Sequence, residues 1–95
     1  MDNHQRKGVR AQRDQLLTLV NGWDPARLLQ AGAPRDEYDV VIDRLLGLLS
    51  RQATKEEIAA FLEREIDEHF GVKAEGAGAF ANKAVAWFVM ASSQP

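Results

Sequence analysis

Cysteine is absent from the 95-residue chain. This absence excludes a disulfide framework, a thiolate metal site and a cysteine nucleophile, and it is typical of a cytoplasmic protein. Long hydrophobic runs are also lacking, because the longest apolar stretch, residues 84–91, is far too short to span a bilayer. No apolar segment follows the basic start, so we expect no secretory signal. These absences predict a cytoplasmic protein without a membrane partner.

Neither sign of charge dominates the chain, which has a formal net charge of −2. The distribution is uneven: residues 6–13 hold four cations and no acid, whereas residues 54–75 hold seven acids and three cations. The acidic segment indicates either an ordinary solvated face or a surface that steers a basic partner. The basic segment has no interleaved aromatics in a chain of pI about 5.6, which is a poor footprint for nucleic acid.

Apolar residues make up 45% and charged residues 27% of the chain, an ordinary globular composition. The length corresponds to a single domain over residues 1–95 with a small core, which a partner could complete. We expect a frayed start over residues 1–7 and a flexible joint over residues 72–78.

Helical periodicity recurs along the chain, and no segment alternates with the period of a strand. The pattern predicts an all-α fold, a small bundle of four to five helices. We expect these helices over about residues 9–20, 25–31, 36–49, 54–70 and 79–91. In the short second helix, Asp24 would be the N-cap and Pro25 the first helical residue.

The third and fourth predicted helices, between Asp36 and Gly71, carry the clearest signals. Thr54 and Glu57 have the spacing of a capping box, and Gly71 is a C-cap. Since few residues separate the two helices, they should form an antiparallel hairpin. Gly47 inside the third helix costs about 1 kcal/mol relative to alanine, and a close approach of helices would explain it. The apolar stripe of the third helix is Tyr38, Val41, Ile42, Leu45, Leu48 and Leu49.

The last predicted helix is apolar on nearly all sides, with only Asn82 and Lys83 polar between residues 79 and 91. Such a helix is either central to a bundle or covered by another molecule. We therefore expect it to be buried or shared in a homodimer.

Motifs for catalysis are lacking. The chain has no G-x-S-x-G and no phosphate-binding glycine loop. Glu65 and His69 lie four residues apart, but two such residues are too few for a zinc site. The acids from Asp36 to Asp43 lie on the polar side of a core helix. We expect no enzyme, no metal and no cofactor.

Four short motifs resemble a family of short bacterial helical proteins of unassigned function. These are W-D-P at 23–25, G-A-P-R-D-E-Y-D at 32–39, E-E-I-A-A-F-L at 56–62 and H-F-G at 69–71. The similarity covers about Trp23 to Gly71. It implies a compact helical fold and a bacterial cytoplasmic origin, and it implies no reaction.

The leading hypothesis is a non-catalytic protein-binding module: an immunity-type antidote whose acidic surface neutralises a basic toxin domain. Alternatives are a self-associating structural or regulatory domain and, less favoured, a nucleic-acid-associated protein. In the structural interpretation of the motif residues, Trp23 packs over the hairpin and Tyr38 keeps its hydroxyl near the surface. The predicted partner-binding residues are Trp23, Asp36, Glu37, Tyr38, Asp39, Glu56, Glu63, Asp67 and Glu68.

Overall fold

The computed structural model describes the backbone of residues 3–93 and the side chains of residues 10–92. Within this part of the chain it has four helices and no strand: α1 (Asn3–Trp23), α2 (Asp39–Ser50), α3 (Lys55–Phe70) and α4 (Ala77–Ser93). The prediction of a small all-α bundle is confirmed. Residues 1 and 2, part of the start predicted to fray, lie outside the described residues.

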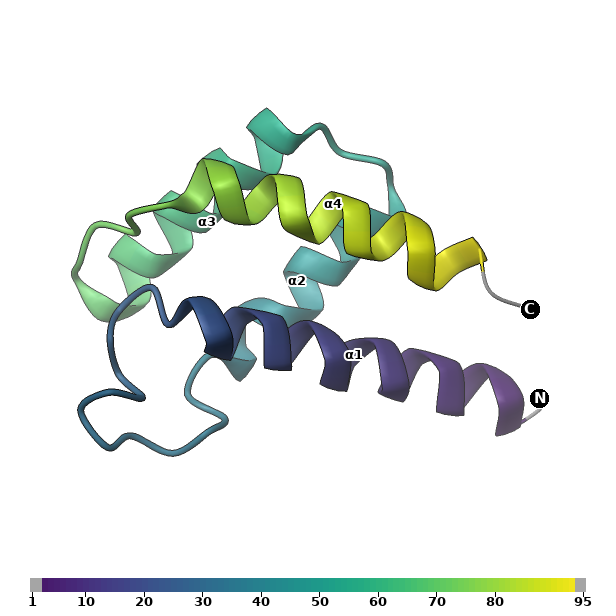
Figure 1. Ribbon diagram of the computed structural model, residues 1–95, viewed down its shortest axis with the longest axis horizontal. Helices are drawn as coiled ribbons and strands as arrows, with labels where there is room; N and C mark the ends of the chain where they lie inside the picture. Colours follow the sequence, from purple (N-terminus) through teal and green to yellow (C-terminus); the bar gives the residue numbers. More distant parts are fainter. Residues whose placement is uncertain (1–2, 94–95) are drawn as a thin grey trace.

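The four helices share one core, and the closest packing is that of α3 against α4. Figure 1 shows α1 and α4 running in opposite directions, so that α1 begins and α4 ends at the same end of the molecule. The helices α2 and α3 form the predicted hairpin, and α3 also packs extensively against α4. The loops at residues 24–38 and 71–76 both lie at the opposite end (Figure 1). We call this end the loop end.

The predicted boundaries of α3 are confirmed by its hydrogen bonds. The Glu57 amide donates to Thr54 Oγ1 at 3.1 Å, and the Thr54 amide donates to Glu57 Oε1 at 2.8 Å. These two bonds satisfy amides that the first turn of a helix leaves without partners. At the other end Gly71 has φ +69°, the left-handed conformation that glycine adopts without steric cost.

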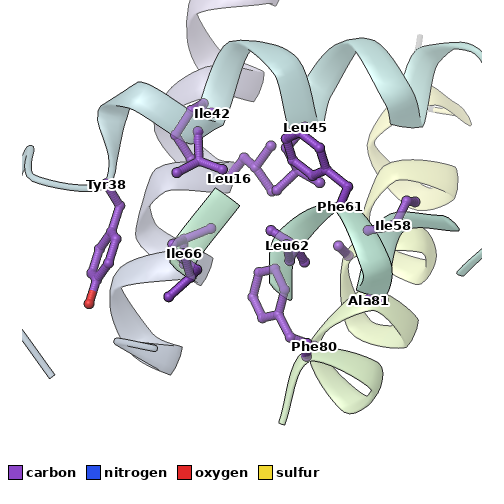
Figure 2. Close-up of a cluster of buried hydrophobic side chains, with 14 of the residues drawn as sticks. Leu16, Tyr38, Ile42, Leu45, Ile58, Phe61, Leu62, Ile66, Phe80 and Ala81 are labelled. Atoms are coloured by element: carbon purple, nitrogen blue, oxygen red, sulfur yellow. The ribbon is translucent and has the colours of Figure 1, made fainter. Parts of the chain in front are cut away.

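The core combines side chains from every helix. Figure 2 shows Leu16 of α1, Ile42 and Leu45 of α2, Ile58, Phe61, Leu62 and Ile66 of α3, and Phe80 and Ala81 of α4 in one cluster. Tyr38 lies at the edge of this cluster, with its hydroxyl directed away from it (Figure 2). The predicted stripe of α2 is confirmed as its inner face, because Val41, Ile42, Leu45 and Leu49 are buried.

The predicted short helix over residues 25–31 is wrong, since these residues form successive turns. Asp24 and Arg27 both adopt positive φ, at +50° and +57°, which interrupts helical geometry. Asp24 also does not act as an N-cap. Its carboxylate accepts hydrogen bonds from the amides of Leu29 and Gln30, beyond the second and third helical positions that a cap would reach.

The last helix is less buried than predicted. Phe80, Ala81 and Ala84, in the first half of α4, are buried in the core. In the second half, the side chains of Val89 and Met90 are 59% and 67% exposed. A central position of α4, one of the two alternatives predicted for this helix, is therefore wrong, because α1 and α3 cover only one side of it; sharing with a second molecule stays a prediction.

The joint between α3 and α4 is anchored at its centre. Ala74 is buried, and the indole of Trp23 donates a hydrogen bond of 2.8 Å to the Glu75 carbonyl. The Trp23 ring also stacks on Phe80, with 4.5 Å between ring centroids. The end of α1 is thereby joined to the start of α4.

Candidate functional site

A buried hydrogen-bond network organises the loop end. Tyr38, which is fully buried, donates from its hydroxyl to Asp24 Oδ1 at 2.6 Å. The same hydroxyl accepts from the Ala26 amide at 2.9 Å. Asp24 is 8% exposed and accepts from the amides of Leu29 and Gln30, both at 3.1 Å. One carboxylate and one phenol thus hold the loop from residue 24 to residue 38.

This network shifts the pKa values of both side chains. Burial and the hydrogen bond to Asp24 raise the pKa of Tyr38 to about 12. For Asp24, burial acts to raise the pKa, but the hydrogen bonds from Tyr38, Leu29 and Gln30 outweigh it and lower the pKa below its ordinary value. At neutral pH the network therefore contains a neutral phenol and an ionised carboxylate.

Beside this network lies a groove with a volume of about 520 Å³. We call it the loop groove. Residues of the 24–33 loop line one part of it, and residues of the 71–76 joint line another. Its lining residues are Trp23, Asp24, Pro25, Ala26, Arg27, Gln30, Val72, Lys73 and Glu75.

A second candidate surface is the outer side of α3. Its acids Glu56, Glu63, Asp67 and Glu68 are all exposed, and among the described residues none of them takes part in an ion pair. We call this set the acidic face of α3. The inner side of the same helix is buried through Ile58, Leu62 and Ile66, so the carboxylates stand on a rigidly packed element.

Glu65 differs from the acids on the outer side, because it points inward and is 3% exposed. Arg44 Nη1 lies 3.3 Å from both of its carboxylate oxygens, and His69 Nε2 lies 3.3 Å from Oε1. Glu65 thus forms one side-chain group with Arg44 of α2 and His69 of its own helix. Over the described residues no group of three acids or histidines could hold a metal ion.

The structure separates the predicted partner-binding residues. Asp36 and Glu37 are exposed at the loop end, and Trp23 is half-buried in its stack with Phe80. Asp39 pairs with Arg13 of α1, with Arg13 Nη2 3.0 Å from Asp39 Oδ1. The four acids of α3 form the acidic face of that helix.

The hydroxyl of Tyr38 lies in the interior of the protein. The expectation of a hydroxyl near the surface is wrong, because the side chain is fully buried and the hydroxyl bonds to Asp24. A partner that binds the folded protein cannot contact it. The role of Tyr38 is to position the loop.

Arg13 is also engaged in the fold. Its Nε lies 2.6 Å from Asp43 Oδ1, and this hydrogen bond lowers the pKa of Asp43. With Asp39 and Asp43 as partners, Arg13 joins α1 to α2. One of the four cations of the basic start is therefore already paired, which further weakens the nucleic-acid hypothesis.

An apolar groove lies between the end of α2 and the second half of α4, with a volume of about 380 Å³. We call it the α4 groove. Its lining includes no charged side chain: Leu49, Gln52, Ala53, Val85, Phe88, Val89 and Ser92. Val89, which lines this groove, is 59% exposed, so the groove carries part of the apolar surface that the composition of the last helix predicted, at the edge of the bundle.

Comparison of the chain with family models, with curated proteins and with solved structures gives no match. Between residues 3 and 93 no helix combines the length and apolarity needed to cross a membrane.

Proposed function

We propose that this chain is a non-catalytic protein-binding module that recognises a basic partner through the acidic face of α3. The observation that carries the proposal is the presence on one well-packed helix of four exposed carboxylates that have no ion-pair partner among the described residues. Such charges attract a basic protein and set its orientation during encounter. Phosphates would be repelled by the same face.

Within this class we put forward an immunity-type antidote, which neutralises a basic toxin domain. This function needs a rigid scaffold and a complementary charged surface, and α3 supplies both. In line with the resemblance over Trp23 to Gly71, the proposed setting is the bacterial cytoplasm.

The experiment is affinity capture from a lysate of the source organism, with three forms of the protein as bait. Glu63→Lys reverses a charge at the centre of the acidic face, and Asp14→Lys makes the same change on exposed α1. We expect the wild type and Asp14→Lys to retain the same basic protein and Glu63→Lys to retain less of it. Equal retention by all three forms would place the interface elsewhere.

A second candidate function, self-association through α4, is favoured by the exposure of Val89, which lines the uncharged α4 groove. Exposed apolar surface of this kind commonly marks an interaction site. Light scattering over a wide concentration range tests it, with Val89→Glu as the probe and Asn82→Glu as a control on the same helix. A mass that rises with concentration in the wild type and Asn82→Glu, but not in Val89→Glu, supports a dimer. A constant monomer mass in all three forms rejects it.

A further inference from the structure

Arg27 adopts a backbone conformation that its residue type disfavours. Its φ of +57° lies in the left-handed region, which glycine and asparagine occupy more readily. Asp24 shares this conformation, but its carboxylate gains three hydrogen bonds from the loop. The Arg27 side chain is exposed and makes no hydrogen bond or ion pair with the described residues. The conformation is held by two backbone hydrogen bonds, from the Arg27 amide to the Asp24 carbonyl at 2.9 Å and from the Ala31 amide to the Arg27 carbonyl at 3.2 Å. Non-glycine residues held in this region often lie at functional positions.

The Arg27 side chain lines the loop groove together with Lys73, which comes from the 71–76 joint. Lys73 is likewise exposed and has no ion pair among the described residues. Two cations from distant parts of the sequence thus line the loop groove. The side-chain amide of Gln30 adds a hydrogen-bond donor. The apolar wall of the groove comes from Trp23, Pro25 and Val72.

The groove lining also holds two acids, so its formal charge is balanced, but the two carboxylates differ in accessibility. Asp24 is 8% exposed, and Tyr38, Leu29 and Gln30 already donate to its carboxylate. Glu75 is exposed, and among the acids of the lining only its carboxylate can face a ligand. The charged groups that a ligand can reach are therefore two cations, Arg27 and Lys73, and one acid, Glu75.

We propose that the loop groove binds a small organic anion, with its phosphate or carboxylate group held by Arg27 and Lys73 and its apolar body against Trp23. Arginine presents a planar fork of donors that matches oxyanions, and lysine adds a point charge. The volume of about 520 Å³ lies within the range of ligand pockets. This site is distinct from the acidic face of α3 and does not depend on the proposed function.

The test titrates the protein with phenyl phosphate, benzoate or inorganic phosphate. Binding is monitored by the NMR signals of the two indole N–H groups. The Trp23 indole donates to the Glu75 carbonyl within the groove, whereas the Trp87 indole donates to Gln15 between α4 and α1. We expect a saturable shift of the Trp23 signal with an aryl anion and no shift of Trp87. The tighter binder of phenyl phosphate and benzoate shows whether the groove prefers a phosphate or a carboxylate group. Binding of both should exceed that of inorganic phosphate, which has no apolar body.

Arg27→Gly is the sharpest variant, because glycine accepts the left-handed backbone and the fold should be retained or stabilised. Loss of a charge-assisted contact should weaken binding by roughly tenfold or more. Lys73→Gln should weaken it as well, Glu75→Gln should strengthen it, and Arg51→Gln, at the end of α2, should not change it. No saturable Trp23 shift at millimolar probe, or equal binding by the wild type, Arg27→Gly and Lys73→Gln, would overturn the proposal.

Discussion

At the scale of single residues, the contact between Asp24 and Tyr38 has the largest consequences for the loop end. Tyr38→Phe keeps the ring against Phe70, whose centroid lies 5.4 Å away in an edge-on contact. It removes the hydroxyl that donates to Asp24 and accepts from the Ala26 amide. Because both partners would remain buried, we expect a loss of about 1–3 kcal/mol in the free energy of unfolding. Urea denaturation measures this loss, and an unchanged midpoint would show that the hydroxyl contributes nothing.

The same pair predicts how stability depends on pH. The pKa of Tyr38 is raised to about 12 in the folded protein, above its ordinary value, so folding favours the protonated phenol. This contribution is complete below the ordinary pKa of about 10 and is lost as the pH rises toward the folded value. The lowered pKa of Asp24 acts in the opposite direction: its contribution is present above the ordinary pKa of about 3.9 and is lost as the pH falls through the folded pKa.

Denaturation of the wild type and Tyr38→Phe across alkaline pH measures the Tyr38 contribution, since titration of the lysines is common to both proteins. We expect the advantage of the wild type to shrink as the pH rises from about 10 to about 12. A difference that stays constant over this range would contradict the assigned state of Tyr38.

The Asp24–Tyr38 contact could not be predicted from local sequence. The pair Asp24–Pro25 is typical of a helix start, and the pattern of residues 25–31 is compatible with a short helix. Whether Asp24 caps that helix or binds Tyr38 depends on where Tyr38, fourteen residues further on, lies in space. Tertiary contacts decided the outcome, as they often do for short segments of weak propensity.

At the scale of elements, α2 and α3 follow their sequence patterns closely. Their apolar stripes became inner faces, and the capping box at Thr54 and Glu57 formed as predicted. These signals are local or have the helical period, so they do not depend on distant contacts. Glu65 is the exception, because only the position of Arg44 on α2 explains why a carboxylate lies on the inner side of α3.

Gly47 yields a prediction for α2. The expected close approach of another helix is wrong, because a Cβ at this position would meet no heavy atom within 4 Å. Gly47→Ala should therefore raise the free energy of unfolding by roughly 0.5–1 kcal/mol through helix propensity and reduced freedom of the unfolded chain. Thermal denaturation measures the change, and destabilisation would indicate a contact that the static structure does not show.

At the scale of the whole molecule, the exposed features lie on different parts of the bundle. The loop groove lies at the loop end, the acidic face lies on the outer side of α3, and the α4 groove lies between the end of α2 and the second half of α4. The sequence could predict that an acidic surface and an unusually apolar helix exist, since both follow from composition and period. It could not predict that α4 lies at an edge or that Arg27 and Lys73 line one groove, because both depend on how the helices pack.

The central claim, a basic partner on the acidic face of α3, is tested most directly by the association rate of the captured protein. The rate is measured at low and high salt for the wild type, Glu63→Lys and Asp14→Lys. We predict that Glu63→Lys associates more slowly and with a weaker dependence on salt, while Asp14→Lys stays close to the wild type. An association rate and salt dependence for Glu63→Lys equal to those of the wild type would contradict the claim.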